Sequence, residues 1–165
     1  MDDWGSHVPV LGALASAYTN GKFLELGAGD YSTPLLHNIS YLKGCLLLTL
    51  ETDQNWLNKY FDMLTPWHKL RAVKDWDLIY GLPEVKDQWF NLIFVDHAPG
   101  ERRIIDIERF MNKCDYMVVH DTQVPHVYGY DQVFPKFKYQ YTYKRFPTWT
   151  TVLSNTNNPN ELFSN

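Results

Sequence analysis

Short uninterrupted runs of apolar residues recur along the chain, and segments with helical spacing separate them. The clearest runs cover residues 23–26, 45–50, 92–96 and 116–120, with a weaker one at 70–73. Strands that are covered on both faces read as continuous apolar runs, and connections long enough to contain a helix return the chain parallel to itself. The pattern therefore predicts a doubly wound α/β fold with a mostly parallel, Rossmann-like sheet and helices on both faces.

The segments between and after these runs complete the predicted fold. Helical spacing and helix-start signals mark residues 8–18, 32–42, 54–64 and 100–112. Near the carboxyl end, aromatic residues alternate with polar ones from 137 to 143, and a second run covers 148–153. The turn between them is too short for a parallel crossover, so we expect an antiparallel hairpin that brings the sheet to seven strands.

Length and composition favour one compact domain. The chain has 165 residues, of which 45% are apolar and 21% charged, enough to build one packed core. We expect a single domain over residues 1–154 and a polar C-terminal tail, 155–165, whose asparagine-rich stretch is too polar to bury anything. The net charge of -4 supplies no positive field for a polyanion, which weighs against nucleic acid as a partner.

Cysteine usage and hydropathy bear on the compartment. Cys45 and Cys114 have neither the spacing of a zinc site nor a CxxC motif. We interpret them as buried thiols in a reducing environment, which predicts a cytoplasmic protein. No apolar run approaches the roughly 20 residues that span a bilayer, so we expect no membrane insertion.

Ligands of open α/β sheets bind beyond the carboxyl ends of the strands, so the residues that follow each run are candidate site residues. Gly27 and Gly29 follow the first run and allow a sharp turn close to a ligand. Glu51 follows the second run, where a carboxylate can accept both hydroxyls of a ribose. Ser32 replaces the third glycine of a dinucleotide fingerprint, and no P-loop motif occurs. The pattern indicates a nucleoside-like cofactor, although singly the glycines could only shape a turn and Glu51 could only cap a helix.

These residues resemble the class I S-adenosylmethionine-dependent methyltransferases, over nearly the whole chain. The stretch Leu-Glu-Leu-Gly-Ala-Gly at 24–29 is similar to that family's first motif, Glu51 to its ribose-binding acid and the terminal hairpin to its seventh strand. The resemblance implies S-adenosyl-L-methionine as cofactor, with Gly27 and Gly29 beside its methionine part. It also implies that the segment 75–77 flanks the adenine, with Trp76 able to stack on it.

The predicted cofactor site therefore combines residues that lie in, end or follow the first four runs. They are Glu25, Gly27, Gly29, Glu51, Asp75, Trp76 and Asp96.

Acidic residues and histidines also end the last two parallel strands of the prediction, as Asp96-His97 and His120-Asp121. This arrangement looks like small-molecule O-methyltransferases, including the catechol type, in which acids at these two places hold Mg²⁺. The resemblance thus implies Mg²⁺ at Asp96 and Asp121. Alternatively, the two acids orient a neighbouring histidine.

Two departures from the catechol pattern shift the predicted chemistry to the histidines. Pro99 stands where that pattern has its lysine base, and Thr122 stands where it has an asparagine. A positioned histidine removes a hydroxyl proton well near pH 7, so His97, His120 and Asp121 are the predicted catalytic residues.

Structural interpretations of the same residues remain open. Either histidine could instead be a hydrogen-bonded core residue, and Asp121 could cap a short helix. Residues 101–103 are interpreted as a solvated helix face.

The sequence thus predicts methyl transfer from S-adenosylmethionine to an oxygen of a small acceptor. With so few residues outside the core, we expect short loops or a second copy in a homodimer to read the acceptor. Two alternatives stay open: a non-catalytic cofactor-binding subunit of a partner, and an RNA methyltransferase that uses the basic and aromatic residues of 136–145.

Overall fold

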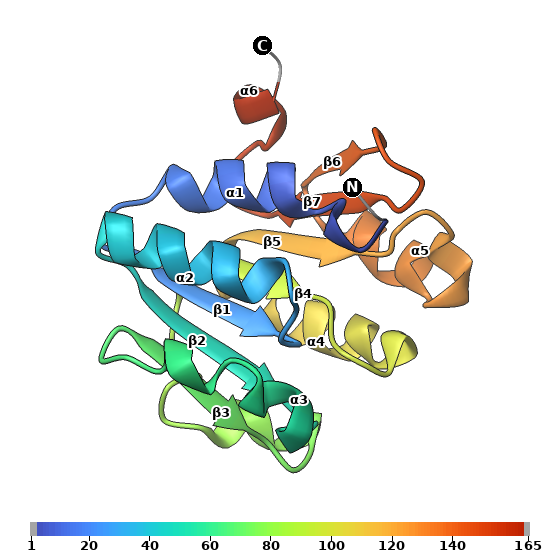
Figure 1. The fold of residues 1–165 in the computed structure, drawn as a ribbon. Coiled ribbons are helices and arrows are strands. Elements are labelled where there is room, and N and C mark those ends of the chain that lie inside the picture. Colours follow the sequence, from blue (N-terminus) through green and yellow to red (C-terminus); the bar gives the residue numbers. More distant parts are fainter. Residues whose placement is uncertain (1–2, 164–165) are drawn as a thin grey trace.

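The computed structural model describes residues 3–163 and confirms the predicted sheet. Seven strands lie in the order β3-β2-β1-β4-β5-β7-β6. Their bounds are β1 Lys22–Leu26, β2 Leu46–Glu51, β3 His68–Ala72, β4 Phe90–Val95, β5 Cys114–His120, β6 Tyr139–Tyr143 and β7 Thr150–Ser154. The first five pair in parallel, whereas β7 is antiparallel to both β5 and β6. The predicted C-terminal hairpin therefore closes one edge of the sheet (Figure 1).

Helices cover both faces of the sheet, as the alternating pattern predicts (Figure 1). The α-helices are α1 Val8–Ser16, α2 Ser32–Lys43, α3 Gln54–Asn58, α4 Arg103–Phe110, α5 Tyr130–Val133 and α6 Asn160–Phe163. Short 3₁₀ segments are η1 Asp3–Gly5, η2 Phe61–Met63, η3 Trp76–Gly81, η4 Gly100–Arg102, η5 Pro125–Val127 and η6 Phe134–Lys136. Among residues 3–163, no helix has the length and apolar character needed to cross a membrane.

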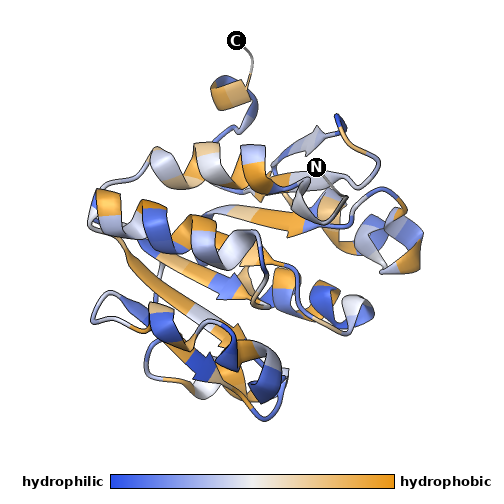
Figure 2. Ribbon diagram, viewed as in Figure 1, coloured by the Kyte–Doolittle hydropathy of each residue, from blue (hydrophilic) through white to orange (hydrophobic). Residues whose placement is uncertain are grey.

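Two apolar layers, one on each face, hold the helices to the sheet. Helices α1 and α2 pack over Phe23, Leu47 and Phe94, whereas α4 and α5 pack over Leu24 and Ile93 on the other face. Successive strand residues point to opposite faces, so a strand buried on both sides supplies both layers. Figure 2 shows the resulting contrast between the largely hydrophobic central strands and the paler edge strand β6.

Two predicted helices are shorter than expected. The helix predicted over 54–64 ends at Asn58, and η2 follows. Between them Tyr60 is buried and its hydroxyl donates to Asp30 at 2.7 Å, which turns the chain inward. The helix predicted from residue 100 begins with η4, and α4 proper starts at Arg103.

The segment after β7 is more closely packed than its composition suggests. Pro159 is buried, the ring of Phe163 stacks on Tyr141 at 4.5 Å, and Nδ2 of Asn155 donates to the carbonyl of Met111 at 3.2 Å. The expectation that the asparagine-rich stretch, residues 155–160, buries nothing is therefore wrong at Pro159. Its asparagines satisfy backbone groups, and its few apolar residues cover the hairpin.

Gly27 lies directly against the backbone of the loop after β4, so a substitution there tests the packing of the two loops. Its φ is +93°, and a Cβ added there would lie 2.7 Å from the backbone N and Cα of His97. We therefore expect Gly27→Ala to lower the free energy of unfolding by roughly 2–4 kcal/mol, because strain and overlap add. Chemical denaturation measures it. The control is Gly81→Ala, whose Cβ would meet nothing within 4 Å; equal losses in the two variants would contradict the prediction.

Candidate functional site

The residues that follow β1, β2, β4 and β5 lie together at the carboxyl ends of these parallel strands. The backbone N–H of Gly27 donates to the carbonyl of Leu50 at 3.0 Å, and that of Asp96 donates to Leu26 at 2.9 Å. These bonds continue the strand ladders by one residue into the loops. The loop after β1 is thereby fixed against the ends of its two neighbouring strands.

Glu25 supports the loop between β1 and α2, residues 27–31, which we call the glycine loop. Its side chain is fully buried and accepts hydrogen bonds from the hydroxyls of Thr33, at 3.0 Å, and Thr49, at 2.6 Å. The Thr33 hydroxyl in turn accepts the N–H of Gly29 at 2.9 Å. Burial raises the pKa of Glu25 to about 7. Glu25 was predicted to bind the cofactor, but its burial restricts it to shaping the loop.

Glu51 joins the loops after β1 and β2. Oε2 accepts the N–H of Ala28 at 3.1 Å, and Oε1 accepts those of Thr52, at 2.7 Å, and Asp53, at 3.0 Å. The Thr52 hydroxyl lies farther from Oε1, at 3.3 Å. Glu51 thus fixes both the loop after β1 and the start of the segment that leads into α3.

Helix α3 and the residue that follows it contact the loop after β1, which the sequence did not predict. The indole N–H of Trp56 donates to the carbonyl of Ala28 at 2.7 Å, and Nζ of Lys59 lies 3.6 Å from the Trp56 ring centre. Lys59 also pairs with Asp30 at 2.9 Å. The glycine loop is therefore held from both ends, by Glu51 and by α3.

Trp76 does not offer an open face for adenine, contrary to the prediction. It is 4% exposed, its indole N–H donates to the carbonyl of Ala98 at 2.9 Å, and its ring stacks on His97 with centroids 4.3 Å apart. The neighbouring Asp75 is exposed and accepts the N–H of Asp77 at 2.8 Å, as the cap of η3. Of the two, only Asp75 lies at the surface beside the end of β3.

His97 is a core residue, which corrects its prediction as a catalytic base. It is 1% exposed, and its Nε2 lies 2.8 Å from Oδ2 of Asp106 on α4. The hydroxyl of Tyr80 also donates to Asp106. The close crossing at Gly27 fixes the backbone of His97 and turns its ring inward, onto Trp76. His97 therefore helps to hold α4 and η3 together.

Arg103 organises the loops after β4 and β5. Nη2 lies 2.9 Å from Oδ1 of Asp96, and Nη1 lies 3.2 Å from Oδ2 of Asp121. Its other donors reach the carbonyls of His97, at 2.7 Å, and His120, at 3.3 Å. The interpretation of residues 101–103 as a solvated helix face is thus wrong for Arg103, which is 6% exposed. Arg103 lies on the same face of α4 as Ile107 and Phe110, a spacing that the sequence already contained.

His120 lies beside Asp96 in a cluster that the N-terminal segment completes. Nδ1 of His120 is 3.2 Å from Oδ2 of Asp96 and 3.6 Å from Oδ1 of Asp121. Nε2 is 2.9 Å from the hydroxyl of Ser6, and the His7 ring meets the His120 ring edge-on at 4.7 Å. The structure places His120 and Asp121 in this cluster together with Ser6 and His7, neither of which was among the predicted site residues.

The electrostatics of this cluster depend on the balance between burial and paired charges. Burial alone would lower the pKa of His120, but Asp96 outweighs it and raises that pKa. Burial alone would likewise raise the pKa of Asp96, but His120 and Arg103 hold it below its usual range. Burial lowers the pKa of His7 to about 4, so this imidazole is neutral at pH 7.

The predicted Mg²⁺ site at Asp96 and Asp121 does not fit this arrangement. The guanidinium of Arg103 already neutralises one oxygen of each carboxylate. The second oxygen of Asp96 faces the imidazole of His120, whereas Mg²⁺ takes near-octahedral oxygen ligands. The two acids serve instead to orient Arg103 and His120.

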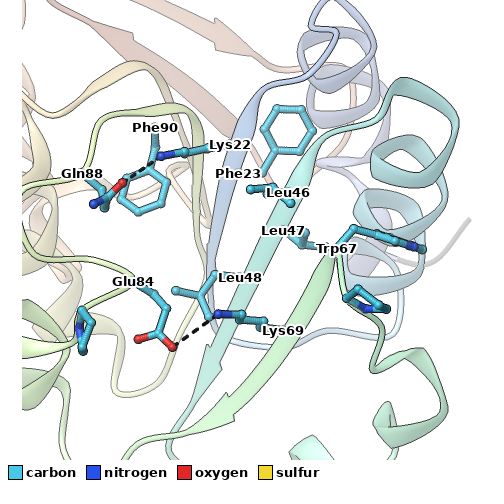
Figure 3. A pocket seen from close by; sticks show the side chains of 12 residues that line it. Lys22, Phe23, Leu46, Leu47, Leu48, Trp67, Lys69, Glu84, Gln88 and Phe90 are labelled. Atoms are coloured by element: carbon cyan, nitrogen blue, oxygen red, sulfur yellow. Dashed lines mark hydrogen bonds and ion pairs between the residues drawn. The ribbon is translucent and has the colours of Figure 1, made fainter.

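Two hollows in the surface differ in their relation to the site. One, of about 370 Å³, is lined by residues that include Thr122, Tyr130, Phe134, Thr142, Trp149 and Thr151. It shares Tyr130 with the site, since that hydroxyl donates to the carbonyl of His120 at 3.4 Å. The other, of about 360 Å³, lies at the amino ends of β1 and β2, with Lys22, Trp67 and Lys69 in its lining (Figure 3). Only the first adjoins the candidate site.

Comparison with known proteins shows similarity in structure only. No family model matches the sequence, and no curated protein is similar to it at a significant level. The O-methyltransferase TomG from Streptomyces achromogenes, in complex with S-adenosylmethionine, superposes with a TM-score of 0.67 at 16% identity, covering 94% of this chain and 88% of that one. Cofactor-bound Rv0187 from MTB superposes with a TM-score of 0.69 at 17% identity, covering 95% of this chain and 82% of that one. TrmK from M. capricolum, in complex with S-adenosyl-homocysteine, superposes with a TM-score of 0.61 at 12% identity, covering 90% of this chain and 69% of that one. The chain therefore has the class I methyltransferase fold.

The raised pKa of Glu25 predicts a pH dependence of stability. In the unfolded chain its pKa is 4.5, against about 7 in the folded state. Between these values the folded state binds more protons, so the contribution of Glu25 to stability is full below pH 4.5 and is lost as the pH rises through 7. Relative to Glu25→Gln, we expect the free energy of unfolding to fall by roughly 3 kcal/mol over this interval. Denaturant titrations at several pH values measure it, with the exposed Glu161→Gln as control. A constant difference between the wild type and Glu25→Gln would refute it.

Removal of the buried guanidinium of Arg103 should lower the free energy of unfolding much more than removal of an exposed guanidinium. We expect Arg103→Met to lower the free energy of unfolding by about 3–5 kcal/mol, because Asp96 and Asp121 would lose their shared cation. In contrast, Arg145→Met, at an exposed position, should change it by less than about 0.5 kcal/mol. Thermal and urea denaturation of both variants provide the comparison, and a loss of under about 1 kcal/mol for Arg103→Met would contradict the assigned role.

Proposed function

We propose that this protein is an S-adenosylmethionine-dependent methyltransferase that acts on an oxygen of a small-molecule acceptor. The observation that carries the proposal is the meeting of two groups of residues at one edge of the sheet. The glycine loop braced by Glu51 contacts the residues after β4, and one of these, Asp96, contacts His120 at the end of β5. The similarity in structure to TomG, an O-methyltransferase in complex with S-adenosylmethionine, supports it.

The residues divide into those that bind the cofactor and those that act on the acceptor. Gly27 and Gly29 would lie along the methionine part, and Glu51 would accept a ribose hydroxyl. An acceptor oxygen then attacks the methyl carbon, so that a C–O bond forms while the C–S bond breaks and S-adenosylhomocysteine leaves. The hydroxyl proton leaves to the cluster around His120 and Asp121, which is the role that we propose for these two residues.

The hollow that reaches Arg103 through the hydroxyl of Tyr130 is the proposed acceptor site. Its lining combines aromatic rings with the hydroxyls of Thr122, Thr142 and Thr151, which form a hydrogen-bonded row at 2.8 and 3.1 Å. Nζ of Lys144 lies 4.3 Å from the ring centre of Trp149 at the same place. Such a lining suits a planar acceptor with its own hydroxyl groups.

Two other functions have some support in particular residues. Pro99, in place of the lysine of the catechol pattern, favours a subunit that binds the cofactor without chemistry. A partner that co-purifies and carries all the activity would establish this. The basic residues of 136–145 favour RNA, but Lys136 already pairs with Glu108 at 2.5 Å. RNA binding that weakens steeply with salt would support that alternative.

Two substitutions separate cofactor binding from methyl transfer. We expect Glu51→Ala to weaken binding of S-adenosylmethionine roughly 10- to 100-fold, because the ribose loses its charged acceptor. We expect His120→Asn to leave that affinity within about twofold and to slow transfer to a hydroxylated acceptor by about 10²-fold or more. Calorimetry measures the first effect, and formation of S-adenosylhomocysteine measures the second.

The matched control for these variants is Glu161→Ala, at an exposed position of α6. It should bind and react as the wild type does. Unchanged cofactor affinity in Glu51→Ala would count against the cofactor site, and full activity in His120→Asn would count against the role of His120.

A further inference from the structure

Three side chains with ligand atoms converge where the start of α1 meets the ends of β4 and β5. Within residues 3–163, one atom each of His7, Asp96 and His120 lies within 4.8 Å of the other two. Nδ1 of His120 lies 3.2 Å from Oδ2 of Asp96. Ligands at about 2.0–2.1 Å from a tetrahedral ion lie roughly 3.3 Å from one another, so this pair already has the spacing of two ligands. The third ligand atom, from His7, lies within 4.8 Å of both.

His7 provides a second, independent indication. It is 3% exposed, and neither of its ring nitrogens has a hydrogen-bond partner among the described residues. Its ring packs on Phe94, with centroids 4.8 Å apart, and meets His120 edge-on. A buried polar group without a partner destabilises the fold, so a bound group that uses this nitrogen would remove that penalty.

The two other side chains are oriented in the way that metal ligands usually are. Nε2 of His120 lies 2.9 Å from the hydroxyl of Ser6, which leaves Nδ1 directed at Asp96. Oδ1 of Asp96 lies 2.9 Å from Arg103, which leaves Oδ2 directed at His120. Metal-binding histidines and carboxylates are commonly fixed by such hydrogen bonds on their other polar atom.

We propose that His7, Asp96 and His120 form a binding site for a divalent transition-metal ion. Two imidazole nitrogens and one carboxylate oxygen suit Zn²⁺, Co²⁺ or Fe²⁺, whereas Mg²⁺ prefers oxygen ligands throughout. Three protein ligands also leave a coordination position open, which is typical of catalytic rather than structural sites.

The consequence for the reaction rests on the proposed function, although the metal site itself does not. An acceptor hydroxyl at the open position would be acidified by the ion, and its proton would pass to Asp121. The side chain of Asp121 is 30% exposed, and its Oδ1 lies 3.6 Å from Nδ1 of His120. His120 would then activate the acceptor as a ligand rather than as the direct base.

Titration with Co²⁺ tests the site, because bound Co²⁺ gives visible absorption bands that report nitrogen ligands. The full chain, first treated with chelator, should bind one Co²⁺, as measured by equilibrium dialysis and by these bands. We expect His7→Phe, which keeps a ring against Phe94, and His120→Asn to weaken binding about tenfold or more. Circular dichroism and thermal denaturation establish that both variants are folded.

Two control variants exclude other histidines. His126→Ala removes an exposed imidazole, and His37→Ala removes one member of the pair in which Nδ1 of His37 lies 3.0 Å from Nδ1 of His68. Both should bind Co²⁺ as the wild type does. No binding by the wild type, or unchanged affinity in folded His7→Phe, would overturn the proposal, and so would loss of binding in His37→Ala with retention in His7→Phe.

Calorimetry with S-adenosylmethionine on the same preparations separates this proposal from the proposed function. Co²⁺ binding that depends on His7, without cofactor binding, would leave the metal site standing and remove the methyltransferase assignment. Cofactor binding without Co²⁺ binding would remove the metal site and leave the methyltransferase assignment standing.

Discussion

The guanidinium of Arg103 lies between two carboxylates that would otherwise repel each other at the ends of β4 and β5. Two unit charges 4 Å apart interact by about 4 kcal/mol at the effective dielectric of a protein surface, so a cation between them reverses a large penalty. Arg103 also donates to the carbonyls of His97 and His120. One side chain thereby fixes the backbone of both loops as well as the direction of both acids. The position of His120, and with it the whole acceptor side of the site, follows from this contact.

The cofactor side depends on a different constraint, the close crossing of two backbones at Gly27. Because no side chain fits between Gly27 and His97, the loops after β1 and β4 lie in direct contact. Glu25 and Glu51 then fix the glycine loop from below and from the side. The two halves of the site are therefore joined through the backbone of residues 96 and 97.

Much of this could be predicted from the sequence, because strand burial, loop glycines and strand-end acids are local signals. The seven strands, the antiparallel hairpin and the pairing of His120 with Asp121 follow from such signals. The roles of His97, Trp76 and Arg103 do not, because they depend on which neighbours meet each side chain in three dimensions. A helical-face analysis could have found two of the missed residues. Arg103 shares a face with Ile107, and His7, just before α1, falls in register with Val10 and Leu11.

Asp96 connects these observations, because its two oxygens face environments of different chemistry. Oδ1 is held by a permanent cation, and Oδ2 lies among imidazoles. A hard ion such as Mg²⁺ would have to displace Arg103 to gain more oxygen ligands, at the cost of leaving a buried guanidinium unpaired. An ion that prefers nitrogen needs no such displacement, since it would replace only the proton shared between His120 and Asp96. The placement of Arg103 thus selects against the metal of the catechol pattern and leaves the imidazole side of Asp96 available for another.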